Sequence, residues 1–185
     1  MRYVALPAAM PVIDSPVVPG VQFTQNESVT IANTTVESSF IGDGVGTANL
    51  SSLFFDSGRT VRIVLSGYMS ATNGDTATVR VKLGTTNIVV STETMPSTFT
   101  DKLFFIEFML TCQTTGITGT VIGQGRTSIH AGVGLSTPTV RSLPMIAPFT
   151  IDTTEGYDID VTYQWGTARV GNTITATNCV IEILN

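Results

Sequence analysis

Hydrophobic positions in this chain alternate with polar ones at a period of two, the pattern of a β-strand with one buried face. The segments 61–66, 79–83 and 158–165 show the alternation most clearly. No apolar stretch repeats convincingly at the 3.6-residue spacing of an amphipathic helix. The sequence therefore predicts an all-β chain whose antiparallel sheets close over one core.

Turn signals rich in glycine divide the alternating segments into short strands. Asn73-Gly74 and Gly171-Asn172 are examples, because these residues supply the positive φ that tight turns require. The predicted strands are 21–24, 28–32, 36–40, 48–54, 60–70, 77–83, 86–91, 102–111, 119–128, 139–142, 147–152, 157–164 and 172–184. Short strands at this spacing indicate an antiparallel β-sandwich of jelly-roll type.

The last predicted strand changes parity along its length. Ile174 occupies one parity, whereas Cys179 and Ile181 occupy the other. A β-bulge inserts one extra residue and so restores the buried face after such a change. We predict a bulge near Thr177 or Asn178.

The first 22 residues differ from the rest, and we assign 1–22 to an extended N-terminal arm and 23–185 to the β-sandwich domain. Half of the chain's eight prolines lie in the arm: Pro7, Pro11, Pro16 and Pro19. Proline fixes φ and disfavours helix at the preceding residue, so the arm should be stiff and extended. A disordered tail is the alternative, but such tails are usually polar and charged. We expect the arm to dock on a neighbouring subunit.

Composition narrows the classes of partner. The chain has 185 residues, of which 42% are hydrophobic and only 12% charged, with a formal net charge of −5. One domain can bury a full core at this length. Nucleic acid is not an expected partner, because Lys and Arg are scattered singly. No membrane anchor is expected, because the strongest apolar run, Leu103 to Leu110, contains Glu107 and is too short to span a bilayer.

Candidate chemistry is sparse, and we expect no enzyme, no cofactor and no metal site. His130 is the single histidine and no nucleophile motif surrounds a serine. Gly42 to Gly46 resembles a phosphate-binding loop, but no helix start follows, so a hairpin loop is the better interpretation. Asp158 and Asp160 share one strand face and are expected to be solvated. The two cysteines have no metal-ligand spacing, and whether they are bonded stays open.

The aromatic residues raise the possibility of sugar binding. Trp165, Tyr163, Tyr157 and Tyr68 could stack on a sugar, because amphipathic rings suit both faces of a glycan. Trp165 continues the inward parity of its strand, so we expect it in the core.

Several blocks of the sequence resemble the β-sandwich virion structural proteins of tailed bacteriophages. The resemblance rests on Val161 to Ala168 followed by Asn172 to Asn178, and on upstream blocks that together cover most of residues 24–184. The upstream blocks are Gly42 to Gly46 before Leu50, Val79 to Gly84, Thr114 to Gly116 and Gly123 to Arg126. None of these motifs is catalytic. The resemblance implies a place in a virus particle more firmly than a particular task there.

Within such particles we expect a capsid cement or decoration protein, made in the host cytoplasm and bound to the outer capsid surface. Its partners would be the major capsid protein and further copies of itself, the resemblance implying a homotrimer. The capsid-binding arm residues would be Tyr3, Leu6, Pro7, Met10, Val12 and Ile13. Extended segments can pair with an exposed strand edge while such side chains fill apolar pockets.

Two alternatives stay open. The first is a head-fibre or tail receptor-binding module whose loops, such as Gly132 to Thr139 or Asn73 to Asp75, contact host surface glycans. The second is a polysaccharide-degrading enzyme on the same scaffold, which would need a carboxylate pair.

Overall fold

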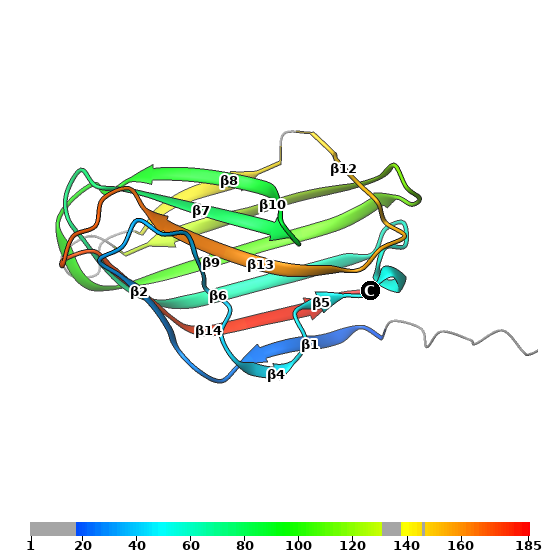
Figure 1. The fold of residues 1–185 in the computed structure, drawn as a ribbon, viewed down its shortest axis with the longest axis horizontal. Coiled ribbons are helices and arrows are strands. Elements are labelled where there is room, and N and C mark those ends of the chain that lie inside the picture. Colours follow the sequence, from blue (N-terminus) through cyan, green and yellow to red (C-terminus); the bar gives the residue numbers. More distant parts are fainter. Residues whose placement is uncertain (1–17, 131–137, 146) are drawn as a thin grey trace, which may run out of the picture.

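The computed structural model describes residues 18–130, 138–145 and 147–185, which form two antiparallel sheets packed face to face (Figure 1). The elements are β1 Gly20–Gln25, β2 Val29–Ala32, β3 Ser38–Ser39, β4 Gly44–Gly46, β5 Asn49–Leu50, a 3₁₀ turn η1 Ser52–Phe54, β6 Thr60–Ala71, β7 Thr76–Leu83, β8 Thr86–Thr94, β9 Phe99–Thr114, β10 Gly119–Ile129, β11 Thr139–Pro144, β12 Phe149–Ile151, β13 Tyr157–Trp165 and β14 Thr173–Ile183. The predicted antiparallel β-sandwich is confirmed. The described part of the chain holds no helix with the length and hydrophobicity to cross a bilayer.

The larger sheet has the strand order β11-β10-β9-β6-β14-β1-β4. Its long central strands are β6, β9, β10 and β14. Two of them carry a pair of short strands on their outer sides: β11 and β12 both pair with β10, and β1 and β2 both pair with β14. The long central strands thus form a broad, continuous surface.

The smaller sheet has the order β3-β13-β7-β8, with β5 also paired to β13. It covers the inner face of the larger sheet (Figure 1). The two sheets bury one hydrophobic core between them. Trp165 is fully buried in that core, as its parity predicts, and its indole N–H lies 3.5 Å from the Ile31 carbonyl oxygen. The Tyr163 and Trp165 rings meet edge to face at 5.0 Å between centroids.

The predicted bulge is confirmed in β14. The register to β6 shifts between Ala176 and Asn178, so that Thr177 is the extra residue. Ile174 on one side of the bulge and Cys179 on the other are both buried. The bulge therefore keeps the whole of β14 facing the same core.

Short edge elements differ most from the sequence prediction. The predicted strand 48–54 divides into β5 and the turn η1, in which the Phe54 amide N–H donates to the Ser51 carbonyl. Gly44–Gly46, interpreted from sequence as a loop, forms the edge strand β4 beside β1. Strand β1 begins at Gly20, inside the range 1–22 given to the arm. These elements depend on distant pairing partners, which local alternation does not encode.

Candidate interaction surfaces

The predicted capsid-binding residues Tyr3, Leu6, Pro7, Met10, Val12 and Ile13 lie outside the described residues. Most of the predicted glycan-contacting loop Gly132 to Thr139 also lies outside them. The two solvent-facing sides of the sandwich therefore provide the candidate sites, and they differ sharply in chemistry.

The outward side of the larger sheet, which we call the large-sheet face, is unusually apolar. Its hydrophobic side chains come from five neighbouring strands: Val64, Tyr68, Leu103, Phe105, Met109, Ile122, Val140 and Val180. Leu103 is 64% exposed and Val140 is 56% exposed. Contiguous apolar patches of more than a few hundred Å² are rare on monomeric proteins and usually mark interaction sites.

Strand register explains why these side chains gather. Tyr68 of β6 pairs with Leu103 of β9, and Ser66 pairs with Phe105, so these side chains leave the sheet on the same side. Val140 of β11 lies in the same row, because it pairs with Ser128, which in turn pairs with Phe105. Residues opposite each other in a sheet have neighbouring side chains, so the rows form one surface.

A hollow of about 500 Å³ lies within this surface. Gly67 and Phe104 contribute to its lining, together with the outward residues Ser66, Tyr68, Leu103, Phe105, Ser128, His130 and Thr177. The extra residue of the β14 bulge, Thr177, donates its hydroxyl hydrogen to the Ser66 carbonyl at 3.3 Å. The bulge is thus part of the wall of the hollow.

The charges on the large-sheet face are balanced in pairs. Arg126 contacts Glu107 at 3.1 Å across β10 and β9, and Arg62 contacts Glu182 at 2.6 Å across β6 and β14. Each pair joins residues directly opposite one another in the sheet. The face consequently presents two local neutral pairs in a chain whose net charge is −5.

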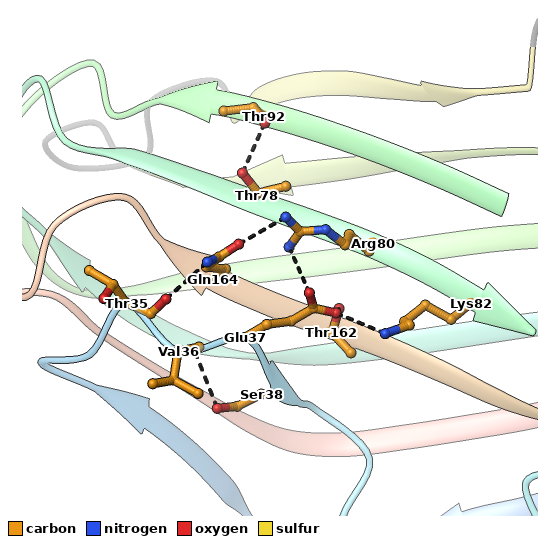
Figure 2. Close-up of polar contacts among 10 residues, drawn as sticks. All are labelled: Thr35, Val36, Glu37, Ser38, Thr78, Arg80, Lys82, Thr92, Thr162 and Gln164. Carbon is orange, nitrogen blue, oxygen red and sulfur yellow. Dashed lines mark hydrogen bonds and ion pairs between the residues drawn. The ribbon is translucent and has the colours of Figure 1, made fainter. Parts of the chain in front are cut away.

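The outward side of the smaller sheet, the small-sheet face, is polar. Figure 2 shows Glu37 between the two cations of β7, with Lys82 Nζ at 3.1 Å and Arg80 at 3.5 Å. The Thr162 hydroxyl donates to Glu37 at 2.7 Å, and Arg80 donates to the Gln164 amide oxygen at 2.8 Å. The Thr162 hydrogen bond, followed by Lys82 and Arg80, lowers the pKa of Glu37. The small-sheet face thus presents charged and polar groups, as a solvated surface does.

The residues considered from sequence as catalytic or metal-binding candidates are dispersed or form structural contacts. Asp160 accepts from the Ser39 hydroxyl at 2.6 Å, and Asp158 accepts from the Asn49 amide at 2.9 Å. His130 is one of the residues that line the hollow. In residues 18–130, 138–145 and 147–185, no group of three or more His, Cys, Asp or Glu side chains is placed to hold a metal ion.

The sequence left the disulfide question open, and in the structure Cys112 and Cys179 are both buried free thiols. Strand β6 lies between β9 and β14, which carry them. Cys179 pairs with Leu65 of β6, and Leu65 pairs with Ile106 of β9, which is six residues from Cys112. At about 3.3 Å per residue, the offset along the strands alone is about 20 Å, beyond the roughly 7 Å limit between the Cα atoms of a disulfide. The same burial raises the pKa of the Cys179 thiol to about 12.

Comparison with known proteins gives only weak structural matches and shows no family. No family model matches the chain, and no curated protein matches it. It is similar to the crystal structure of the infectious bursal disease virus VP2 subviral particle, at 11% identity and a TM-score of 0.29, over 98% of this chain and 37% of that one. It is also similar to a structure of the infectious bursal disease virus Gx strain, at 14% identity and a TM-score of 0.19, over 100% of this chain and 47% of that one.

The chain therefore spans less than half the length of either of these viral chains. A β-sandwich hosts many unrelated functions, so likeness at this level does not identify a task. The functional inference accordingly depends on the surfaces of the domain.

Sequence reasoning missed the large-sheet face, although a signal was present. In the run Leu103 to Leu110 both parities are apolar except at Glu107. Near-continuous apolar runs are typical of strands covered on both sides. The run is too short to cross a membrane, but its outward residues Leu103, Phe105 and Met109 mark a surface that a partner can cover.

Proposed function

We propose that this chain is a structural protein of a virus particle, of the capsid cement or decoration type, and not an enzyme. The observation that carries the proposal is the uncovered large-sheet face. A folded domain gains little by exposing Leu103, Tyr68 and Val140 to water unless another protein surface removes them from it. The sequence resemblance to phage β-sandwich virion proteins supports a particle as the setting, and the sandwich itself is the expected scaffold.

The proposed mechanism uses two kinds of contact. The apolar N-terminal arm binds the major capsid protein on the outside of the head, by adding main-chain hydrogen bonds to a strand edge and filling apolar pockets. Copies of the folded domain associate, a homotrimer being the arrangement that the resemblance implies. Several arms on one assembly raise the effective concentration of each later arm at its site. The protein would be made in the host cytoplasm and reside on the outer capsid surface.

Co-sedimentation with capsids stripped of this component tests the proposal. Full-length protein should pellet with capsids and saturate a regular number of sites, whereas a variant lacking residues 1–17 should stay in the supernatant. This truncation ends before Gly20, so strand β1 remains complete. The full-length double variant Leu6→Ser and Ile13→Ser should also lose binding. This variant keeps the arm at full length, so it tests whether the apolar side chains themselves are needed. Capsid binding that is unchanged by both alterations would refute the arm mechanism.

A receptor-binding module is the second candidate, and the hollow beside Tyr68 favours it. Tyr68 is 42% exposed, whereas Trp165 and Tyr163 are buried and so inaccessible to a sugar. An exposed ring beside the polar groups of Ser128 and His130 resembles the mixed surface that binds glycans. Glycan-array binding that disappears in Tyr68→Ala, with no capsid binding by the full-length chain, would favour this candidate over the first.

A further inference from the structure

We propose that the large-sheet face is covered by the folded domain of a second copy of this chain. The inference rests on the proposed function only in treating the chain as an assembly component, and it names the surface through which copies meet. Three features of the face argue for this occupant: its extent, its charge balance and the composition of its central strand.

The extent of the face matches what a stable protein–protein contact needs. Five strands at about 4.8 Å spacing give a width of about 24 Å, and ten residues at about 3.3 Å give a length of about 33 Å. The product is roughly 800 Å², which is the area that each partner contributes to a standard interface. A short peptide would leave much of this surface uncovered, whereas a second folded domain would cover it.

The charge balance of the face suits a copy of the same chain. Two copies each carry a net charge of −5 and repel one another at long range. The large-sheet face avoids this repulsion, because Arg126 is paired with Glu107 and Arg62 with Glu182. Because these charges are paired within one copy, the face adds little like-charge repulsion when another copy covers it. A strongly charged partner would gain nothing from it.

The sequence of β9 indicates that both sides of this strand are covered in the final assembly. Phe104, Ile106 and Phe108 point into the core and are buried, whereas Leu103 and Phe105 point outward. Strands with one solvated side alternate between apolar and polar residues, and strands covered on both sides do not. The core accounts for one side of β9 only, so the second side requires a partner.

The small-sheet face shows what a solvated side of the same domain looks like. Strand β7 alternates buried valines with Thr78, Arg80 and Lys82, and these outward residues form hydrogen bonds to neighbouring strands and loops (Figure 2). Its exposed apolar residue, Val90 on β8, stands opposite Arg80. Covering this face would desolvate the Glu37 charge network at considerable cost. In an assembly we therefore expect the small-sheet face to stay in water and the large-sheet face to be covered.

The test is the solution mass of full-length protein, measured without capsids by sedimentation and light scattering over a wide concentration range. Wild-type protein should give an oligomer, and Leu103→Lys should weaken self-association by about 30-fold or more, the effect of losing a central contact. Val140→Lys, on a different strand of the same face, should do the same. Val90→Lys is the matched control, because Val90 is as exposed as Val140 at 56% but lies on the small-sheet face.

All three positions are exposed, so the variants should keep wild-type thermal unfolding transitions, which verifies the fold. A wild-type monomer at high concentration overturns the inference, as does an oligomer that survives both face substitutions. Dissociation by Val90→Lys to the same extent also overturns it. An oligomer that dissociates only when residues 1–17 are removed would make the arm the occupant. Because capsids are absent, failure here leaves the co-sedimentation result for the proposed function intact.

Discussion

Replacing Asn172 with alanine should destabilise the fold more than any other single amide truncation among the described residues, because this side chain makes three hydrogen bonds between two connections. Asn172 is fully buried and lies immediately before β14, in the connection from β13. Its amide nitrogen donates to the Asp75 carboxylate at 2.8 Å and to the Thr167 carbonyl at 3.2 Å. Its amide oxygen accepts from the Thr72 amide N–H at 3.0 Å. The side chain therefore fastens the β6–β7 turn to the β13–β14 connection.

The expected magnitude follows from these three bonds. A neutral hydrogen bond contributes about 1 kcal/mol net, and one to a charged group about 2 kcal/mol. The Asn172→Ala variant loses two of the first kind and one of the second, so its free energy of unfolding should fall by about 4 kcal/mol. Arg169 remains 3.2 Å from Asp75 and limits the cost to that carboxylate. For a chain of this length, the loss corresponds to a melting temperature lower by about 8–16 °C.

Urea unfolding followed by tryptophan fluorescence measures this loss, since Trp165 is the single tryptophan and is fully buried. Asn49→Ala is the matched control, because Asn49 donates one exposed hydrogen bond to Asp158 at 2.9 Å. The control should cost less than about 0.5 kcal/mol. If Asn172→Ala lost no more than about 1 kcal/mol, or no more than the control, the buried amide would not be what holds these loops together.

Two further predictions concern ionisable groups. Glu37→Gln should lower the free energy of unfolding by about 0.5–1 kcal/mol at pH 7, a modest value because Glu37 is 30% exposed. The folded-state pKa of Glu37 lies below the ordinary 4.5, so this stabilisation is present above pH 4.5 and is lost as pH falls through the lowered pKa. Urea titrations should therefore show a smaller difference between variant and wild type at pH 3 than at pH 7. Cys179 should resist alkylation in native protein at pH 8, because burial raises its thiol pKa to about 12, and should react once urea unfolds the chain. Mass spectrometry that found rapid native labelling of Cys179 would contradict its burial.

The long strands could be predicted from sequence because their period-two alternation is a local property. The bulge at Thr177 was predictable for the same reason, since one extra residue is what restores the buried side after a change of parity within β14. The edge strand β4 was not predictable, because Gly44 to Gly46 form a strand only where β1 offers them hydrogen-bond partners. The sequence predicted Asn172 only as a turn residue. Its buried hydrogen bonds could not be predicted, because their partners Asp75 and Thr72 are about 100 residues away in the sequence.

Glycines within strands were also ambiguous in the sequence. Gly123 and Gly125 lie in the middle of β10 rather than in a turn, and a Cβ at Gly123 would lie 2.5 Å from the Phe108 ring. The missing side chains leave space for that ring, which is fully buried between the sheets. Glycine can mark either a turn or a close approach of another group, and only the position of Phe108 distinguishes the two.

The contrast between β7 and β9 links the fold to the function that we propose. Both are long internal strands of one sandwich, and both place apolar residues in the same core. On their outer sides β7 presents Arg80 and Lys82, whereas β9 presents Leu103 and Phe105. Folding of a single copy requires only the inner sides, so it does not account for this difference. An apolar outer side weakens solubility unless it is covered. The difference is therefore expected for a domain in an assembly, whose small-sheet face contacts water and whose large-sheet face contacts another copy.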